Sequence, residues 1–468
     1  MPNFLFSEFS PVSAKQWKQK IQADLKGADY NETLLWKTDE GITVKPFYHQ
    51  DNYEALAVPE PAYPFSSCQT IFITDEQTAN FLAKDALKRG ATSLQFEANK
   101  PFNIDKLFDG VAVPTNLSEG ETAIRIHFKL NFLLESCVSE LIEKTVKNSI
   151  FLNIDLIGNL AKTGNWFQNQ QNDYAVLKIL LQKAPKNVQV LSVDASLYQN
   201  AGATTVQQIA YALAHANEYL NYFHKKNTIQ SLSEEALKSI QFHFSVGGNY
   251  FFEIAKLRAF RVLWKLLCDD YTLKIEPYIF VQPSLRNKTL YDYNVNMLRT
   301  TTECMSALLG GADTISNVAY DSIYHKKNEF GERIARNQLL ILQEESYFKD
   351  AAQMAEGSYY IEALTKEIAK KALQIFKDIE KSGGFLKQLF AGTIQRKIKE
   401  SAQKEQARFD NGEEILLGTN KYINPKDMIK DIIERYPFVK TNTRKTAIQP
   451  VIPKRLAEKI EQERLEKE

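Results

Sequence analysis

The sequence predicts an α/β protein built on a (β/α)8 barrel, the TIM-barrel class. Short runs rich in β-branched and aromatic residues alternate with longer segments of helical periodicity, and this alternation is typical of a parallel sheet. Eight such runs spread over roughly 250 residues or more, which is the size of a (β/α)8 barrel. A doubly wound open sheet gives a similar pattern and stays open as an alternative.

The expected strands are Thr70–Thr74, Ser93–Glu97, Ala123–Phe128, Ile150–Ile157, Val188–Val193, Ile240–Val246, Tyr278–Gln282 and Thr314–Val318. Between them, a helix starts at Thr204 or Thr205, where Gln207 or Gln208 completes a capping box. Another helix carries an apolar stripe from Phe251 to Leu266, which is expected to face the core.

Four parts follow one another along the chain. Residues 1–64 form an extended N-terminal arm, which has a helix at Ser13–Leu25 and too few residues to bury its own aromatic side chains. Residues 65–356 form the barrel. Residues 357–425 form a helical linker with a long helix that ends at Gly383-Gly384, followed by a second run at Phe385–Phe409. Residues 426–468 form a charged C-terminal tail, whose last part, Arg455–Glu468, is expected to be a solvated helix or a frayed end.

The composition is that of a soluble globular protein. Of 468 residues, 44% are hydrophobic and 25% charged, and the net charge of +1 gives no reason to expect a nucleic-acid or membrane partner. No apolar run of ~18 residues occurs, and the N-terminus does not resemble a signal peptide. The four cysteines are widely spaced, which indicates neither a disulfide framework nor a zinc site and is consistent with a cytoplasmic location.

The common catalytic motifs for nucleotide, metal or serine-hydrolase chemistry are absent. His127 and His243 lie in expected strands, so either could point into a barrel. Gly247-Gly248-Asn249 follows a strand and could cradle an anion, but a tight loop is the stronger interpretation. Gly310-Gly311 precedes the last expected strand and can equally be interpreted as an anion-binding turn or as the end of a helix.

Several longer motifs carry a family resemblance, in order along the chain. They are Asp39–Pro46, Ala201-Gly202-Ala203, Glu253–Ala259, Tyr293–Glu303, Leu308–Ala312, Arg333–Gln338 with Leu342–Glu345, Gly357–Glu362 and Gln406–Asp410. Together they resemble the cobalamin-dependent acyl-CoA mutases over roughly residues 10 to 425. The resemblance implies an arm, a barrel threaded by the pantetheine of an acyl-CoA, a helical linker and a flavodoxin-like cobalamin domain.

The departures from the family pattern concern its chemistry. The family's Asp-x-His-x-x-Gly loop, whose His ligates cobalt, does not occur, and the cobalamin domain is expected to be absent. The family's His, which can donate to the thioester carbonyl, falls on Leu197. The family's Tyr- and Arg-bearing segment after the arm is not recognisable, and the stretch 159–172, which should supply an Arg for the substrate carboxylate, has none.

These departures resemble those of the non-catalytic small subunit of a heterodimeric methylmalonyl-CoA mutase, a complex that interconverts (R)-methylmalonyl-CoA and succinyl-CoA. The resemblance implies that this chain binds no cofactor, that adenosylcobalamin is held by a large catalytic partner, and that the arm meets this partner through Trp17, Trp36, Phe47 and Tyr48. Catalytic and metal-binding residues are expected to be absent from this chain.

Three alternatives remain. The first is an active mutase barrel that uses a cobalamin domain on a separate chain. The second is an unrelated barrel enzyme such as a lyase, with Arg286, His243 and Lys288 as site groups. The third is a regulatory binding protein that acts on the mutase from outside, although the P-loop expected of such proteins is missing.

Overall fold

Eight parallel strands close into a barrel in a computed structural model that describes residues 6–61, 65–111, 124–144, 149–223, 239–350, 354–440 and 443–468. Their order is β10-β3-β4-β5-β6-β7-β8-β9, and β10 closes the ring by pairing with both β9 and β3. The barrel fold is therefore confirmed and the open-sheet alternative is wrong. The strands are β3 (Ser66–Phe72), β4 (Ser93–Ala98), β5 (Arg125–Leu130), β6 (Ser149–Ile154), β7 (Val188–Asp194), β8 (Ser239–Val246), β9 (Glu276–Pro283) and β10 (Thr314–Ile315).

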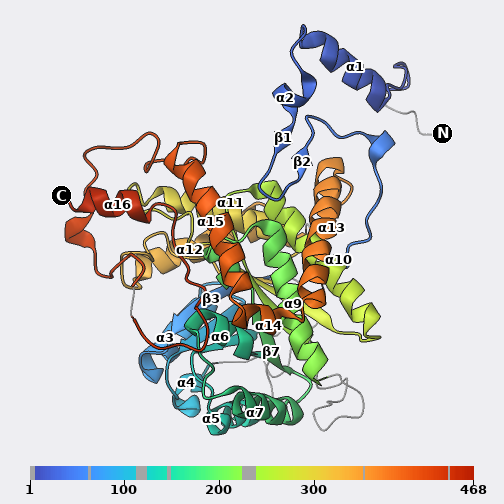
Figure 1. The fold of residues 1–468 in the computed structure, drawn as a ribbon. Helices are drawn as coiled ribbons and strands as arrows, with labels where there is room; N and C mark the ends of the chain where they lie inside the picture. The colour runs from blue at the N-terminus through green and yellow to red at the C-terminus, as the bar shows by residue number, and fades with distance from the viewer. Residues whose placement is uncertain are drawn as a thin grey trace.

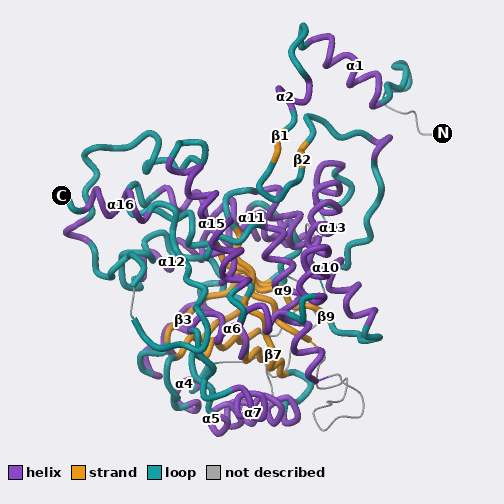
Figure 2. Tube along the Cα trace, viewed as in Figure 1, coloured by secondary structure: helices purple, strands orange, loops and turns teal. Residues whose placement is uncertain are grey.

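Helices surround the strands, as Figures 1 and 2 show. Six of the eight units have one helix after the strand, and the units of β6 and β7 have two. The barrel helices are α3 (Glu76–Lys88), α4 (Ile104–Phe108), α5 (Glu135–Lys144), α6 (Leu156–Thr163), α7 (Gln170–Lys183), α8 (Ser196–Asn200), α9 (Thr205–Phe223), α10 (Tyr250–Asp270), α11 (Val295–Leu309) and α12 (Glu329–Leu340). The linker helices α13 (Tyr359–Lys381), α14 (Phe385–Phe390) and α15 (Thr393–Asp410) follow, and α16 (Glu458–Leu465) lies near the C-terminus.

The capping signals in the sequence act as expected. Ser13 caps α1 (Ala14–Asp24) in a capping box with Gln16. Thr204 and Gln207 form the same reciprocal pair ahead of α9, with the Gln207 side chain accepting from the Thr204 backbone at 2.9 Å. Gly383 and Gly384, both at positive φ, end α13. The expected end of the arm at Pro64 and the expected strand start at Ala123 lie outside the described residues.

Three helical expectations need correction. The helix α10 is buried nearly all round from Phe252 to Arg261 because α9, α11 and α13 all pack on it, whereas Phe251 and Leu266 are exposed. The run Phe385–Phe409 is two helices, since Gly392 adopts a left-handed conformation (φ 72°) between them. The charged tail is not solvated, because Arg455, Glu458 and Glu461 are all buried.

The arm has almost no core of its own. Among residues 6–61, only Tyr30 and Ile42 are buried, and α1 contributes no buried side chain. The helix α2 (Tyr30–Leu34) and the two-stranded ribbon β1 (Trp36–Lys37) and β2 (Thr43–Val44) lie at the arm's root. Figure 1 shows α1 projecting away from the barrel. The arm therefore depends on contacts outside itself.

The root of the arm packs on the barrel's own helices. Trp36 meets Phe252 of α10 edge-on, with ring centroids 5.8 Å apart, and Tyr48 lies 5.1 Å from Tyr360 of α13. Asp39 pairs with Arg408 of α15 at 2.9 Å. Part of the apolar surface that the sequence assigns to a partner is thus covered within the chain.

The shortest strand, β10, is held by a buried ion pair. Arg261 of α10 donates to Asp313, just before β10, at 2.8 Å, and both side chains are almost completely buried. Asp313 also accepts from the backbone N–H of Ile279 in β9 at 2.7 Å. The closure of the barrel therefore depends on the Asp313 carboxylate, which links α10 to β9.

We expect Asp313→Ala to lower the free energy of unfolding by about 3–5 kcal/mol, because it leaves the Arg261 guanidinium buried and unpaired. The matched control is Asp269→Ala, which breaks the exposed Lys265–Asp269 pair of the same helix and should cost less than about 1 kcal/mol. Urea unfolding measures both. Equal losses in the two variants would contradict the role of Asp313 in barrel closure.

Candidate functional site

The interior of the barrel is filled by side chains rather than left as a channel. Alternate residues of each strand point inward, and in this barrel they are large. The inward set combines rings and polar side chains, each at most 7% exposed: Gln95, Arg125, His127, Phe151, Gln241, His243, Tyr278, Phe280 and Thr314.

These side chains meet across the barrel. The strands β5 and β9 lie four places apart in the ring of eight and so face each other. His127 of β5 nevertheless lies 4.9 Å from Phe280 of β9, measured between ring centroids. Phe151 of β6 lies 4.2 Å from Tyr278 of β9 and 4.4 Å from His127. At this level the bore is spanned from wall to wall.

Polar groups fix this layer. The Gln241 side chain contacts both His127, at 2.9 Å, and His243, and Arg125 donates to the Tyr278 hydroxyl at 3.3 Å. The sequence placed His127 and His243 in strands that could point inward, and both do. Burial lowers the pKa of His127 well below its ordinary value and that of His243 to about 4, so both imidazoles are neutral at pH 7.

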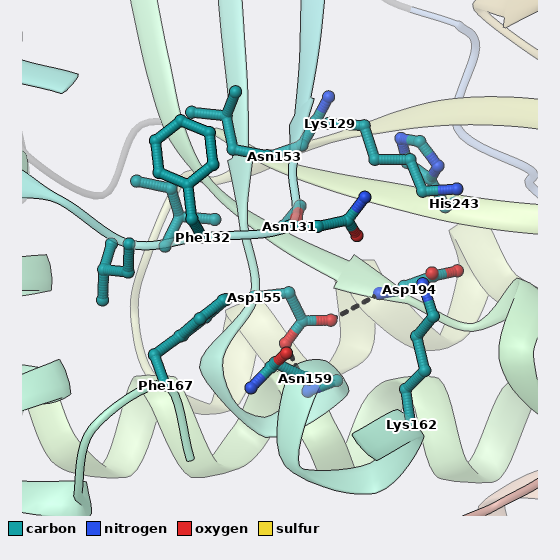
Figure 3. A pocket seen from close by; sticks show the side chains of 15 residues that line it. Lys129, Asn131, Phe132, Asn153, Asp155, Asn159, Lys162, Phe167, Asp194 and His243 are labelled. Atoms are coloured by element: carbon teal, nitrogen blue, oxygen red, sulfur yellow. Dashed lines mark hydrogen bonds between the residues drawn. The ribbon is translucent and has the colours of Figure 1, made fainter. Parts of the chain in front are cut away.

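Above this layer, at the carboxyl ends of β5 to β8, lies a small pocket of about 70 Å³. Figure 3 shows titratable side chains gathered in it: Lys129 beside the neutral His243, Asp194 at the end of β7, and Lys162 rising from α6. Burial lowers the pKa of Lys162. Burial by itself would raise the pKa of Asp194, but His243, Lys129 and a hydrogen bond from Ser196 outweigh it, and the net shift is downward.

Asp155 organises the floor of this pocket. Its carboxylate accepts from the backbone N–H groups of Asp194, at 2.7 Å, and Gly158, at 2.8 Å, so it caps α6 and ties β6 to β7. It also accepts from the Tyr219 hydroxyl at 2.8 Å and lies 2.9 Å from His215. With this many partners within the chain, Asp155 holds α6, β7 and α9 together.

Asn153 is the one strained residue at the pocket. It lies one residue before the end of β6 with a positive φ of 50°, where the pairing with β7 shifts register, and its buried amide has no hydrogen-bond partner. Strained residues of this kind often mark sites of function. The pocket thus retains the layout of a barrel site, with the site-forming residues at the carboxyl ends of the strands.

A larger groove of about 870 Å³ lies outside the bore, between α3 and α12. Three of its cations are already engaged: Arg89 with Asp85 at 2.8 Å, Arg336 with the Gln69 side chain at 3.1 Å, and Lys327 with the Thr70 carbonyl at 2.8 Å. Glu97 of its lining pairs with Lys129 of the small pocket at 3.8 Å, so the two cavities adjoin.

The family model for methylmalonyl-CoA mutase matches residues 105–467. The chain is 34% identical over 459 residues to the methylmalonyl-CoA mutase small subunit of Porphyromonas gingivalis, covering 92% of this chain and 72% of that one. It is 27% identical to the small subunit of Streptomyces virginiae, covering 89% of this chain and 71% of that one. It is also 27% identical to the methylmalonyl-CoA mutase of Cereibacter sphaeroides, covering 89% and 65%. The chain belongs to the methylmalonyl-CoA mutase family.

Within this family, the position implied for the proton-donating His is Leu197. Leu197 lies in α8, is 5% exposed and packs in the main apolar core. A leucine has no proton to donate. The stretch 159–172 contains no Arg, and the cations nearest the pocket are instead Lys129 and Lys162.

The site groups of the unrelated-enzyme alternative are not brought together. Arg286 pairs with Glu405 at 2.6 Å, and Lys288 forms a buried pair with Glu303 at 2.7 Å, whereas His243 lies in the bore. At Gly247, the Glu253 carboxylate accepts the backbone N–H at 2.9 Å, so a carboxylate of the chain already fills the position of an anion. The tight-loop interpretation holds there.

Among the described residues, no three His, Cys, Asp or Glu side chains are arranged to hold a metal, and all four cysteines are buried and free.

Several pocket residues were missed from the sequence. Lys129 could have been found, because it continues the alternation of Arg125 and His127 along one strand. Asp194 stands at the end of an expected strand, where barrel sites gather. Lys162 carries no such signal, since it reaches the pocket only through the position of α6.

The neutral histidines predict acid sensitivity. Between pH 6.5 and about 4 the unfolded chain binds a proton at His243 that the folded chain does not, so the folded state loses stability as the pH falls through this window. The shift corresponds to about 3 kcal/mol. Urea unfolding at pH 7 and pH 5 should show a smaller loss for His243→Asn than for the wild-type chain. Equal losses in both would contradict the burial of a neutral His243.

Proposed function

We propose that this chain is the small, non-catalytic subunit of a heterodimeric methylmalonyl-CoA mutase, whose complex interconverts (R)-methylmalonyl-CoA and succinyl-CoA. The observation that carries the proposal is the filled bore. In this family the pantetheine arm of the substrate threads the barrel, and here Phe151, Tyr278 and Phe280 pack around His127 along that path. Their removal from the bore would cost the burial of three large rings.

The chemistry of the remaining pocket supports the same conclusion. A general acid has to reach the reacting carbonyl, but the family position for it holds Leu197. A pocket of about 70 Å³ is far below the volume of ordinary ligand sites. With a pKa of about 4, His243 is a weak base at neutral pH, and the Asp155 carboxylate is occupied by hydrogen bonds from its own chain.

The family's cofactor does not fit this chain. Adenosylcobalamin needs the cobalt-ligating Asp-x-His-x-x-Gly loop, and no Asp-x-His occurs in the sequence. We therefore assign the cofactor to a large catalytic partner and derive no reaction step in this chain.

The arm supports the assignment of a partner. Phe6, Phe9 and Trp17 are 74%, 68% and 49% exposed, and α1, which carries Trp17, has no buried residue. Apolar surface of this kind usually marks an interaction site. Trp17 rests only against Phe47 within the arm, with ring centroids 6.3 Å apart. We infer that the outer arm, with Trp17 and Phe47, wraps the catalytic subunit, while Trp36 and Tyr48 fix the root of the arm.

The purified chain should show no mutase turnover with adenosylcobalamin and methylmalonyl-CoA, and Leu197→His should not restore it. A general acid contributes about 10²–10⁴-fold only when substrate and radical source are already in place. A coupled assay for succinyl-CoA measures both. Turnover by the chain mixed with an isolated cobalamin-binding domain would instead favour the active-barrel alternative.

The chain should form a 1:1 heterodimer with the catalytic subunit of the same organism, through an interface above about 1,600 Å². Deletion of residues 1–53 should abolish the heterodimer in size-exclusion chromatography and leave the barrel folded. Trp17→Ala should weaken binding by about 2 kcal/mol or more. The control is Phe390→Ala, an equally exposed aromatic outside the arm, which should have no effect. An unchanged heterodimer without the arm would contradict this assignment.

A further inference from the structure

Residues 443–468, here called the C-terminal strap, cross the carboxyl-end loops of the barrel. The strap first meets the end of α6, behind β6. The backbone N–H groups of Ala447 and Ile448 donate to the Gly164 carbonyl at 2.9 and 3.1 Å, and that of Val451 donates to the Ala161 carbonyl at 2.8 Å. The segment is drawn in red in Figure 1, running past α6 toward α16.

Gly164 is fitted to this contact. It adopts a left-handed conformation, with φ at 81°, at the end of α6. A Cβ atom at this position would lie 2.7 Å from the Ile448 carbonyl oxygen and 2.8 Å from Thr446 Cβ. The barrel loop and the strap approach so closely that only glycine can stand between them.

The middle of the strap joins two further loops. The backbone N–H of Lys454 donates to the Asn200 carbonyl, after β7, at 3.0 Å, and that of Leu456 donates to the Arg286 carbonyl, after β9, at 2.9 Å. The Arg286 guanidinium returns a bond to the Lys454 carbonyl at 2.7 Å. Loops behind β6, β7 and β9 are thereby connected by one segment.

The end of the strap is anchored by buried charge. Arg455 pairs with Glu461 of α16 at 2.6 Å, with both side chains buried, and donates to the Lys288 carbonyl at 3.0 Å. Glu461 accepts the backbone N–H of Leu290 at 2.7 Å. At the very end, Glu468 accepts from the Tyr291 hydroxyl at 2.5 Å. The apolar side chains Ile448, Val451, Leu456 and Ala457 are buried as well.

We propose that the C-terminal strap is a clamp that locks the loops behind β6, β7 and β9 into one rigid unit. In barrel enzymes these loops carry the chemistry, and they commonly move to admit substrate or exclude water. Here one segment forms hydrogen bonds with backbone groups of three loops at once, and its own apolar side chains are buried. The inference concerns this chain alone and does not depend on the proposed function or on any partner.

Two neighbouring residues of the strap provide a matched test. Val451 is 3% exposed and Ile452 is 51% exposed. Val451→Asp buries a charge and should release the strap, whereas Ile452→Asp places the same charge in solvent. Hydrogen–deuterium exchange followed by mass spectrometry reads the peptides that cover residues 161–166, 197–203 and 284–291.

In Val451→Asp, all three peptides should exchange roughly tenfold faster or more, because local opening becomes accessible without global unfolding. Peptides from β8 and α9 should keep wild-type protection, and Ile452→Asp should match wild type throughout. A chain ending at residue 442 is the second variant and should show the same three accelerated regions. Release of the strap with wild-type exchange in the three loops would overturn the clamp, as would acceleration in one loop only.

Discussion

The contact between opposite strands inside the barrel is the constraint on which the rest of the structure depends. His127 and Phe151 on one side meet Tyr278 and Phe280 on the other, and the Gln241 amide holds the two histidines in place. A barrel packed in this way gains apolar burial and ring contacts but gives up a path along its axis. The elements outside the bore therefore stabilise a barrel whose axis is closed, and they do not form the entrance to an open one.

Buried charge follows the same pattern. Arg261 with Asp313 closes the ring at β10, and Arg455 with Glu461 anchors the end of the chain to the loop after β9. The Arg261–Asp313 pair joins elements far apart in sequence, whereas Arg455 and Glu461 both belong to the strap and bond to backbone groups of the loop after β9. Such pairs contribute little net stability compared with apolar packing, but removing one partner is costly, so each strongly disfavours displaced arrangements of its elements. The arm is the exception, since its outer half has no such anchor among the described residues.

Much of the fold could be predicted from the sequence, because it rests on local signals. These signals each lie within a few consecutive residues of the sequence. They comprise the eight strands, the cap at Ser13, the Thr204–Gln207 capping box and the stop at Gly383-Gly384. The break at Gly392 was missed since one glycine within a long amphipathic run does not always end a helix. The apolar stripe on α10 was misjudged because three helices pack around α10. The periodicity of a helix does not show how many other helices will pack against it.

The site could be predicted only in part. The absent acid at Leu197 and the missing Arg between residues 159 and 172 were visible by comparison with a family pattern. The filled bore was not, because it arises where His127 meets Phe280, more than 150 residues further along the chain. The docking of the charged tail was hidden for a similar reason: the partners of Arg455 and Glu461 lie at Lys288 and Leu290, and a run of charges resembles a solvated helix until those partners are known.

The most direct test of this account is whether the isolated chain binds an acyl-CoA. Isothermal titration calorimetry of the purified, arm-containing chain with succinyl-CoA should give no saturable heat up to about 1 mM, because the axis of the barrel is occupied by Phe151, Tyr278 and Phe280. One-to-one binding with a Kd near about 1 μM would show that the bore admits the thioester arm and would contradict the account.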